Sequence, residues 1–464
     1  MTAAAKRSFA ALSVRNYRLY FGGQLTSLAG NWMQIVAELW LILELTGSGL
    51  AVGIATALQF TGIMLFGLWG GALADRFDKR KLLIITQLAM AAPALALFGL
   101  ALSGSVEVWI VYALIAVRGL VLAIDSPTRQ AFAMELVGPE RIVNAVALNS
   151  MLVHSARMAG PALAGVVIAL WGVSICFAVN ALSFIVMIGA LVAMRSGELG
   201  SKPPRQEAYG IGAALRAVRD KRELRVPLLL MAALSTLGFN FPVVIPLLAR
   251  FSFGGDITTY SMLMVAIGIG AIAGSLFAAS HGRTGPGFVA VGAAGFGVAG
   301  LLATVAPSLA LEMAALTLLG AAGVTFAASI NAGLQLAAAP EMRGRVMALY
   351  MVVFIGSTPI GGPLMGWLAE AVSPRASLLV GALTGLAVAS VALRGLRPRA
   401  EKSVESGELE PAPQHAPDRT RQLPRAVRDR QDHGHRTSSP GRCASHPAPV
   451  GARDCRAEPS GRTR

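Results

Sequence analysis

The sequence predicts an all-α membrane protein with twelve transmembrane helices in two six-helix bundles. Three observations lead to this fold class. Of the 464 residues, 54% are hydrophobic and only 14% are charged, with a mean hydropathy of +0.60, whereas soluble domains carry about a quarter charged residues. Apolar runs of about 20 residues recur along the chain and are separated by short charged or Gly/Pro breaks. A stretch of the first half also recurs in the second half.

The apolar runs give the predicted spans in chain order. They cover residues 18–43, 50–73, 82–103, 108–129, 145–170, 173–194, 226–249, 257–280, 286–306, 309–335, 345–370 and 376–396. We therefore divide the chain into an N-terminal segment (1–17), an N-terminal bundle (18–195), a linker (196–225), a C-terminal bundle (226–396) and a tail (397–464). The linker is basic toward its end and can form a helix on the membrane surface. The tail is basic and poor in apolar residues, so we expect it to be disordered.

The internal repeat has an offset of 201 residues. Residues 139–165 read PERIVNAVALNSMLVHSARMAGPALAG, and residues 340–366 read PEMRGRVMALYMVVFIGSTPIGGPLMG. The matching positions include Gly160 with Gly361 and Gly165 with Gly366. Repeats of this kind, in the same orientation, are typical of large secondary transporters whose binding site lies between the halves.

The distribution of Lys and Arg predicts the orientation. Loops on the side of the termini hold nearly all of these residues, whereas the opposite loops hold Arg250 and Arg375. The positive-inside rule therefore places both termini in the cytoplasm of a multi-pass cell-membrane protein. This asymmetry and the tail account for the net charge of +15, so a nucleic-acid partner is not needed to explain it.

The first span carries five polar residues at spacings of three and four, which are Gln24, Ser27, Asn31, Gln34 and Glu38. Residues at this spacing share one face of a helix. Because polar atoms are costly in hydrocarbon, we expect this face to line a water-accessible cavity between the bundles. Further residues expected to contact an amphipathic solute there are Trp32, Gln59, Asn149, Tyr350 and Phe354.

Ionisable residues within spans are the candidates for proton coupling. They are Glu38, Arg118, Asp125, His154 and Arg157. For Glu38, three interpretations remain open: a proton carrier, a structural ion pair with an arginine, or a residue at the outer mouth. His154 is either a second proton carrier or a hydrogen-bonded packing residue, and Arg157 is suited to orient a carboxylate or an anionic substrate group.

The loop between the second and third spans reads GGALADRFDKRKLL and resembles the signature loop of the major facilitator superfamily. The residues that carry the resemblance are Gly71, Leu73, Ala74, Asp75, Arg76, Arg80 and Lys81, whereas Asp78 stands where the family usually has glycine. The resemblance implies that this loop, through Gly71, Asp75, Arg76 and Arg80, latches one conformation against a helix N-terminus of the second half. A simple positive-inside anchor would explain the basic residues but not Gly71 together with Asp75.

The fifth span, SARMAGPALAG, resembles the signature of exporters in that superfamily at Gly160, Pro161 and Gly165. Ordinary packing of small residues is the alternative. Longer stretches, from NYRLYFGGQLTSLAGNWMQ to RGRVMALY, resemble the enterobactin-exporter-like group, also called transmembrane secretion effectors. The resemblance implies proton antiport of siderophores or amphipathic drugs across the bacterial cytoplasmic membrane.

We therefore expect a proton-coupled exporter of small amphipathic molecules that acts as a monomer, needs no metal or cofactor and is not an enzyme. The alternatives are a facilitator or importer of polar solutes, and a membrane receptor or assembly protein that has lost transport. The chain contains no Walker loop and no hydrolase motif. GFGVAG, Gly295–Gly300, matches a dinucleotide fingerprint, but it lies inside a span, where helix packing explains it.

Overall fold

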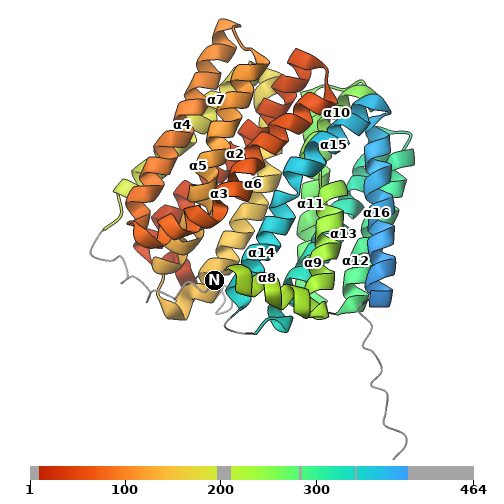
Figure 1. Cartoon of the computed structure of the whole chain (residues 1–464). Helices are drawn as coiled ribbons and strands as arrows, with labels where there is room; N and C mark the ends of the chain where they lie inside the picture. Colours follow the sequence, from red (N-terminus) through yellow and green to blue (C-terminus); the bar gives the residue numbers. More distant parts are fainter. Residues whose placement is uncertain (1–9, 196–210, 282–284, 340–341, 396–464) are drawn as a thin grey trace, which may run out of the picture. The chain divides into compact units, whose positions relative to one another are not determined.

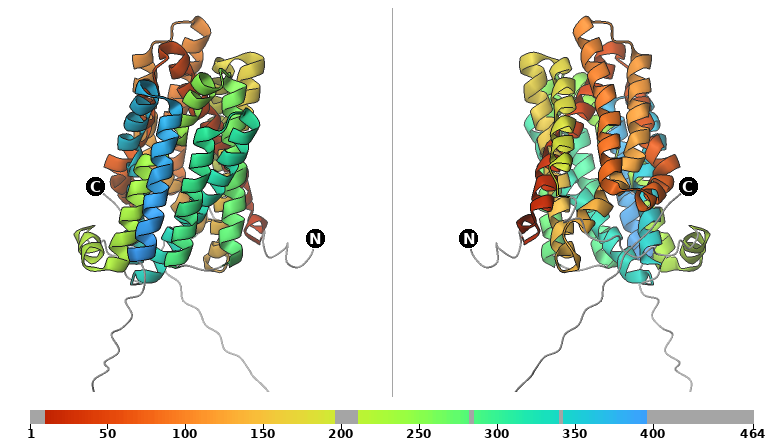
Figure 2. Two further views of the ribbon diagram at one scale, coloured as in Figure 1. Left: turned by 90° about the vertical axis from the view of Figure 1, so that its right-hand side faces the viewer. Right: turned by 90° about the vertical axis from the view of Figure 1, so that its left-hand side faces the viewer.

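The computed structural model describes residues 10–195, 211–281, 285–339 and 342–395. The described part is almost entirely helical, and its long helices run roughly side by side (Figure 1; Figure 2). The predictions for residues 1–9, 196–210 and 396–464, which include the tail, lie outside the described residues.

The first half forms six long helices in the predicted order. They are α2 (Arg15–Thr46), α3 (Gly49–Arg76), α4 (Lys79–Ser103), α5 (Val108–Glu135), α6 (Ile142–Trp171) and α7 (Val173–Val192). Short 3₁₀ turns, η1 (Ala10–Ser13) and η2 (Pro139–Arg141), precede α2 and α6. The connections are tight: Gly47 ends α2 with a φ of 63°, and the Ser48 hydroxyl then accepts a hydrogen bond from the Ala51 N–H at the start of α3.

The second half begins with α8 (Ile211–Asp220), a short helix within the predicted linker. The seventh crossing consists of α9 (Arg222–Leu237), α10 (Phe241–Leu247) and the π-turn η4 (Leu248–Ser252), with a break near Asn240. Four further crossings complete the bundle: α11 (Ile257–His281), α12 (Pro286–Val305), α13 (Leu309–Ala337), and α14 (Arg343–Gly356) continued by α15 (Thr358–Ala371). The last helix is α16 (Pro374–Gly395).

Eleven of these segments are long and apolar enough to cross a membrane. The remaining helix of sufficient length is α2, with 32 residues, and its polar residues lower its hydropathy. The twelve predicted crossings therefore correspond to twelve helical segments in two bundles. We call the side at which α2 begins the basic side, and the side at which α2 ends the opposite side.

Glycines at the repeat offset make equivalent contacts in the two bundles. An added Cβ at Gly160 of α6 would lie 2.3 Å from the Cβ of Trp32 on α2, and one at Gly361 of α15 would lie 2.1 Å from the Thr236 carbonyl on α9. Each of these contacts joins the fifth crossing of a bundle to the first. The repeat in the sequence is therefore a repeat in helix packing.

The second glycine of each pair joins the two bundles. An added Cβ at Gly165 of α6 would lie 2.5 Å from the Cβ of Ser261 on α11, and one at Gly366 of α15 would lie 2.2 Å from the Gly49 carbonyl on α3. Helix backbones approach this closely only where side chains are absent. The two bundles thus meet along α6–α11 and α3–α15.

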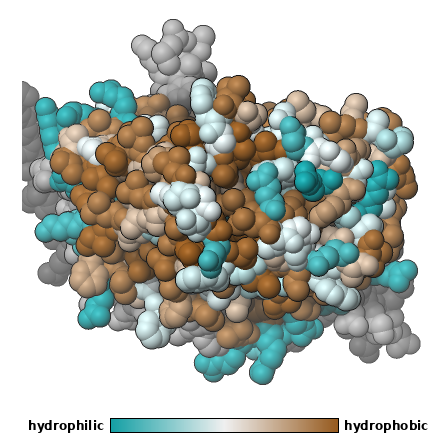
Figure 3. Space-filling view, turned by 90° about the horizontal axis from the view of Figure 1, so that it is seen from above, coloured by the Kyte–Doolittle hydropathy of each residue, from teal (hydrophilic) through white to brown (hydrophobic). Residues whose placement is uncertain are grey.

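On the opposite side, the bundles share one apolar core. It includes Trp40 of α2 stacked on Tyr260 of α11, with ring centroids 6.1 Å apart. The Glu370 carboxylate of α15 also accepts hydrogen bonds from the Ser48 hydroxyl (2.6 Å) and the Leu50 N–H (3.0 Å) of the other bundle. Seen from above, hydrophobic side chains cover much of this face, with hydrophilic ones scattered between them (Figure 3).

Toward the basic side, each bundle has a core of its own. One core holds Tyr17, Tyr20 and Phe132 of the first half, and the other holds Phe296, Phe326 and further apolar residues of the second. The described structure is therefore closed on the opposite side, where the core is continuous between the bundles.

The contact between α3 and α15 gives a first prediction. An added Cβ at Gly53 would lie 2.5 Å from the Gly362 carbonyl oxygen, a backbone atom that cannot rotate away. We expect Gly53→Val to destabilise the protein by about 1–3 kcal/mol through overpacking, measured as a lower apparent unfolding temperature in detergent. Gly99→Val in α4 is the matched control, because an added Cβ there meets nothing within 4 Å. Equal losses in both variants would contradict the close contact.

Candidate functional site: two buried polar clusters in the N-terminal bundle

The first cluster surrounds Glu38 and draws on four helices of one bundle. Its members, which we call the Glu38 cluster, are Gln34 and Glu38 of α2, Gln59 of α3, Arg118 of α5 and Asn180 of α7. Arg118 forms an ion pair with Glu38 and also donates to the Gln59 side-chain oxygen at 3.3 Å. The Gln34 amide donates to Glu38 at 2.7 Å, and the Asn180 amide donates to Gln34. All five side chains are almost fully buried.

The second cluster lies nearer the basic side, around Asp125 and Arg129 of α5. Its members, the Asp125 cluster, also include Ser27 of α2 and Thr86 and Gln87 of α4. Asp125 and Arg129 are one helical turn apart and form an ion pair. Asp125 accepts from Thr86 (2.7 Å) and Gln87 (2.8 Å), while Arg129 donates to Gln87 (2.9 Å) and Ser27 (3.1 Å).

Each cluster holds one carboxylate and one guanidinium, so the buried charges cancel within each pair. Two hydrogen-bond donors, Arg118 Nε and Arg129 Nη1, have no partner among the described residues. An arginine that loses its carboxylate to protonation becomes an uncompensated buried cation. The charge state of each carboxylate is therefore tied to the pairing of the neighbouring arginine.

These contacts correct the prediction that the polar face of α2 lines a cavity between the bundles. Ser27, Gln34 and Glu38 point into the interior of the N-terminal bundle, where α4, α5 and α7 supply their partners. Gln24 is also buried, and its amide donates to the Asn149 side chain of α6 at 2.9 Å. Asn31 is the half-buried member of the face. The physical reason is that protein groups, rather than water, satisfy most of these polar atoms.

Of the three interpretations of Glu38, the geometry contradicts a position at the outer mouth. Glu38 is only 1% exposed and is paired with Arg118. The pair is the structural ion pair considered from the sequence. Proton transfer by Glu38 is compatible with this pairing and remains a proposal.

The other predicted contact residues occupy different places. Tyr350 is buried and stacks on Phe354, which meets Phe239 edge to face at 5.9 Å. Tyr350 therefore belongs to an aromatic core inside the C-terminal bundle, which corrects its prediction as a cavity residue, whereas Phe354 is half-buried against this core and its contact with a solute stays a prediction. Arg157 has no carboxylate partner among the described residues and lies 5.1 Å from the Trp32 ring centroid, at cation–π distance. His154 lies on α6, and its side chain is outside the described part.

The signature loop is not engaged as a latch in this conformation. Asp75 and Arg76 are exposed near the end of α3, and Asp75 has no hydrogen bond within the described residues. Arg80 donates to the carbonyls of Leu191 (2.7 Å) and Val192 (3.0 Å) at the end of α7. Gly71 is half-buried, with open space where a Cβ would lie.

The departure from the family pattern at Asp78 has a local explanation. Asp78 has a φ of −63°, which any residue can adopt, so no glycine is required there. Its carboxylate caps α4 by accepting a hydrogen bond from the Lys81 N–H at 2.8 Å. The turn therefore keeps its shape without the glycine.

The fifth-span signature acts through its small residues. Gly160 allows α6 to pack on α2, and Gly165 allows α6 to meet α11 of the other bundle. Pro161 lies within α6, which continues from Ile142 to Trp171. This contact does not depend on an export function, so the exporter-specific interpretation of the signature stays a prediction.

Several members of the clusters are not among the residues predicted from the sequence. Arg129, Gln87, Thr86 and Asn180 were not predicted, although each interrupts an apolar run as Glu38 does. Arg129 follows Asp125 by four residues, a spacing that places both on one helical face. The signal that could have identified all four is a polar residue inside an apolar run.

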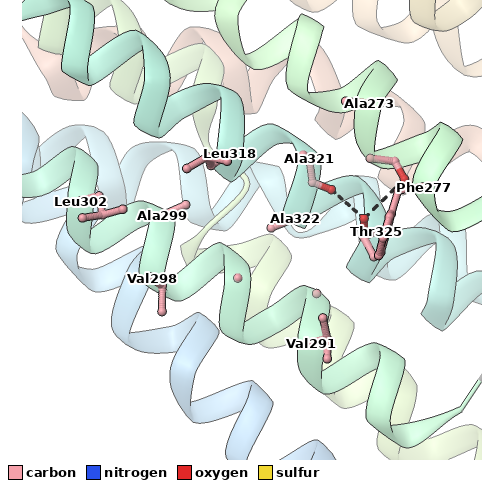
Figure 4. Close-up of a pocket in the computed structure, with 13 residues that line it drawn as sticks. Ala273, Phe277, Val291, Val298, Ala299, Leu302, Leu318, Ala321, Ala322 and Thr325 are labelled. Carbon is pink, nitrogen blue, oxygen red and sulfur yellow. Dashed lines mark hydrogen bonds between the residues drawn. The ribbon is translucent and has the colours of Figure 1, made fainter.

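A hollow of about 560 Å³ lies between α11, α12 and α13, outside both clusters. Its walls are apolar and rich in Ala and Gly, and the Thr325 hydroxyl within it donates to the carbonyls of Gly274 and Ala321 (Figure 4). Exposed side chains such as Val291 and Leu318 border it. The hollow offers no charged or free polar group and is not a candidate for proton coupling.

Residues 6–421 match the family described as transmembrane secretion effectors. The chain therefore belongs to this family of the major facilitator superfamily, whose fold and members are those of membrane transporters. The resemblance inferred from the motifs is confirmed.

The relatives with descriptive names include the following proteins. The staphyloferrin A transporter of Staphylococcus aureus is 26% identical over 270 residues, 56% of this chain and 66% of the relative, slightly less than two thirds of its length. Macrolide efflux protein A of Streptococcus pyogenes is 23% identical over 58% of this chain and 68% of its own. The multidrug efflux pump Tap of Mycobacterium tuberculosis is 27% identical over 391 residues, 80% of this chain and 91% of its own.

Two crystal structures share the fold. A point mutant of the nucleoside transporter NupG has a TM-score of 0.65 at 14% identity, covering 83% of this chain and 99% of its own. A bacterial homologue of the human lysosomal transporter Spinster has a TM-score of 0.64 at 14% identity, covering 85% and 96%. The predicted fold class is confirmed.

The Glu38–Arg118 pair gives a second prediction. Removing one partner, as in Arg118→Gln or Glu38→Gln, leaves the other charged group buried without its counter-charge. We therefore expect the free energy of unfolding to fall by about 3–5 kcal/mol. The double variant should lose less than the sum of the single variants, because neither charge remains. Unfolding in detergent of the four proteins measures this coupling.

The control is the exposed pair Arg219–Asp220, with side chains 78% and 66% exposed. The same double-mutant cycle there should give a coupling near zero, at most about 1 kcal/mol. Additive losses at Glu38 and Arg118 would show that the pair is not coupled in the folded protein.

Proposed function

We propose that the chain is a secondary transporter that exports small amphipathic molecules, such as drugs or siderophores, in exchange for protons. The single observation that carries the proton part of this proposal is the buried Glu38–Arg118 pair. The names of the relatives support the substrate class, since they include a siderophore transporter, a macrolide efflux protein and a multidrug efflux pump.

The proposed orientation determines which side of the membrane this conformation can exchange solutes with. We infer that the basic side faces the cytoplasm, because Lys and Arg concentrate there. The closed opposite side then faces outward, so substrate enters this conformation from the cytoplasm. The conformation that is open on the opposite side requires α3 to separate from α15. In that conformation the basic side is closed, and Asp75 can approach a helix N-terminus in the other half.

Glu38 is proposed to exchange the proton. In its ionised form it neutralises Arg118, as in the described pair. A proton on Glu38 removes the negative charge that a donor group of the substrate would bind, so the proton and the substrate compete for the same carboxylate. Competition of this kind is what an antiporter needs, because one site must respond to both solutes.

Reconstituted proteoliposomes test the proposal with a radiolabelled macrolide as the probe. With a pH gradient imposed, the wild-type protein should move the macrolide against its own gradient and against the proton flow. Glu38→Gln should lose this uphill movement yet still exchange labelled for unlabelled macrolide, because glutamine resembles the protonated acid but cannot release a proton. Glu44→Gln, an exposed position on the same helix, is the matched control and should behave as wild type.

Other outcomes identify the alternatives. Macrolide movement that ignores the pH gradient in the wild-type protein would indicate a facilitator, and accumulation in the direction of proton flow would indicate an importer. No movement of a macrolide, of a siderophore or of a panel of amphipathic drugs would favour a receptor that retains the fold.

A further inference from the structure

A third buried carboxyl group, Glu312, lies in the first turn of α13, in the C-terminal bundle. It has no exposed surface, and neither carboxylate oxygen has a hydrogen-bond partner among the described residues. This differs from Glu38 and Asp125, whose oxygens accept bonds from several donors. An ionised carboxylate without donors is strongly disfavoured in an apolar interior, whereas the neutral acid is tolerated.

Glu312 lies at the opposite side, where the structure is closed. Ala315 and Leu316, in the next turn of α13, belong to the apolar core that both bundles share, and Leu309 and Met313 pack against it. Separation of the bundles on this side would disrupt that core. The hydration of Glu312 therefore depends on whether the opposite side is open or closed.

Arg375, at the start of α16, interacts electrostatically with Glu312. The Arg375 guanidinium donates one bond to the Ala306 carbonyl at 2.8 Å and lies 5.9 Å from the Phe253 ring centroid. It is half-buried and has no carboxylate partner within 4 Å among the described residues. Arg375 is thus available as a counter-ion for an ionised Glu312.

Other titratable groups near this end of α13 are few. On the adjacent α11, Tyr260 is buried and its hydroxyl has no partner among the described residues; Asp256, directly before that helix, is exposed and accepts hydrogen bonds from the backbone N–H groups of Thr258 and Thr259. The described part of α12 carries no titratable side chain. The titratable groups on the other helices packed against α13, and at the far end of α11, lie toward the basic side. They are Arg222, Glu223, Arg225, His281, Arg343, Arg345 and Tyr350.

We propose that Glu312 is a second proton-binding site and that the opposite side closes only when Glu312 carries a proton. When that side opens, water reaches the carboxyl group, the proton leaves to the water on that side, and Arg375 balances the carboxylate. A proton taken up from the same side removes the charge and permits burial again. The proposal deepens the proton exchange proposed above and rests on it for its role in transport, while net proton movement across the membrane is left to Glu38.

Distance measurements between spin labels test the proposal without any substrate. Labels are attached to cysteines placed at Thr46 and Val372, which are exposed on the opposite side in different bundles, in full-length protein whose native cysteines are replaced. Pulsed electron spin resonance in nanodiscs between about pH 5 and pH 9 brackets the titration of a buried carboxyl group. The wild-type protein should be closed at low pH and increasingly open at high pH.

Glu312→Gln, which resembles the neutral acid, should remain closed, with its open population reduced at least about fivefold at the pH where half of the wild-type protein is open. Arg375→Gln should shift the midpoint of opening upward by about one pH unit or more, because the counter-ion is lost. Glu107→Gln is the control, because Glu107 is an exposed carboxyl group on the same side, and it should titrate as wild type.

Opening of Glu312→Gln with the wild-type pH dependence would overturn the proposal, as would a wild-type protein that stays in one state at every pH. If Glu312→Gln does not fold, isotope-edited infrared spectra of Glu38→Gln decide, because Glu38 cannot contribute to them: a glutamic-acid C=O band from a protonated, buried group in the closed state supports the proposal, and its absence overturns it. These measurements do not involve transport. They can therefore support the role of Glu312 even if proton-coupled export is contradicted, and they can contradict that role even if export is supported.

Discussion

The structure depends on one constraint: polar atoms on a membrane-spanning helix must find partners within the protein, because hydrocarbon offers none. In α2 this constraint sets which way the helix faces. Glu38 requires a cation and finds Arg118 on α5, and Gln34 requires a donor and finds Asn180 on α7. The polar face of α2 therefore holds its own bundle together, and any proton exchange at Glu38 changes the partner on which this packing depends.

The two bundles share a helix pattern but differ in their interiors. Gly160 and Gly361 make equivalent contacts at the repeat offset, which maintains the common architecture. The N-terminal bundle nevertheless encloses the ion pairs Glu38–Arg118 and Asp125–Arg129, whereas the C-terminal bundle encloses an aromatic core around Phe239 and the isolated Glu312. Among the described residues, the buried ion pairs thus lie in the first bundle, whereas the second holds a buried carboxyl group without a hydrogen-bond partner at its closed end.

The sequence predicted the fold because span length, glycine spacing and basic loops are local features that the bilayer imposes directly. It also identified Glu38, Arg118 and Asp125 as unusual, since a charge in an apolar run is visible without a structure. It could not predict the direction of the α2 polar face. A stripe at helical spacing is equally compatible with a wet cavity and with the interior of a bundle, and only the positions of Gln87 and Asn180 on other helices distinguish them.

The central claim is that a proton and the bound substrate compete through the Glu38–Arg118 pair. The most direct measurement is the number of protons released when a macrolide is added to the detergent-solubilised protein in weakly buffered solution. The account predicts that the wild-type protein releases protons at a pH where part of the population carries a proton on Glu38. Glu38→Gln should release no protons, although the macrolide still binds. Equal proton release by both proteins would contradict it.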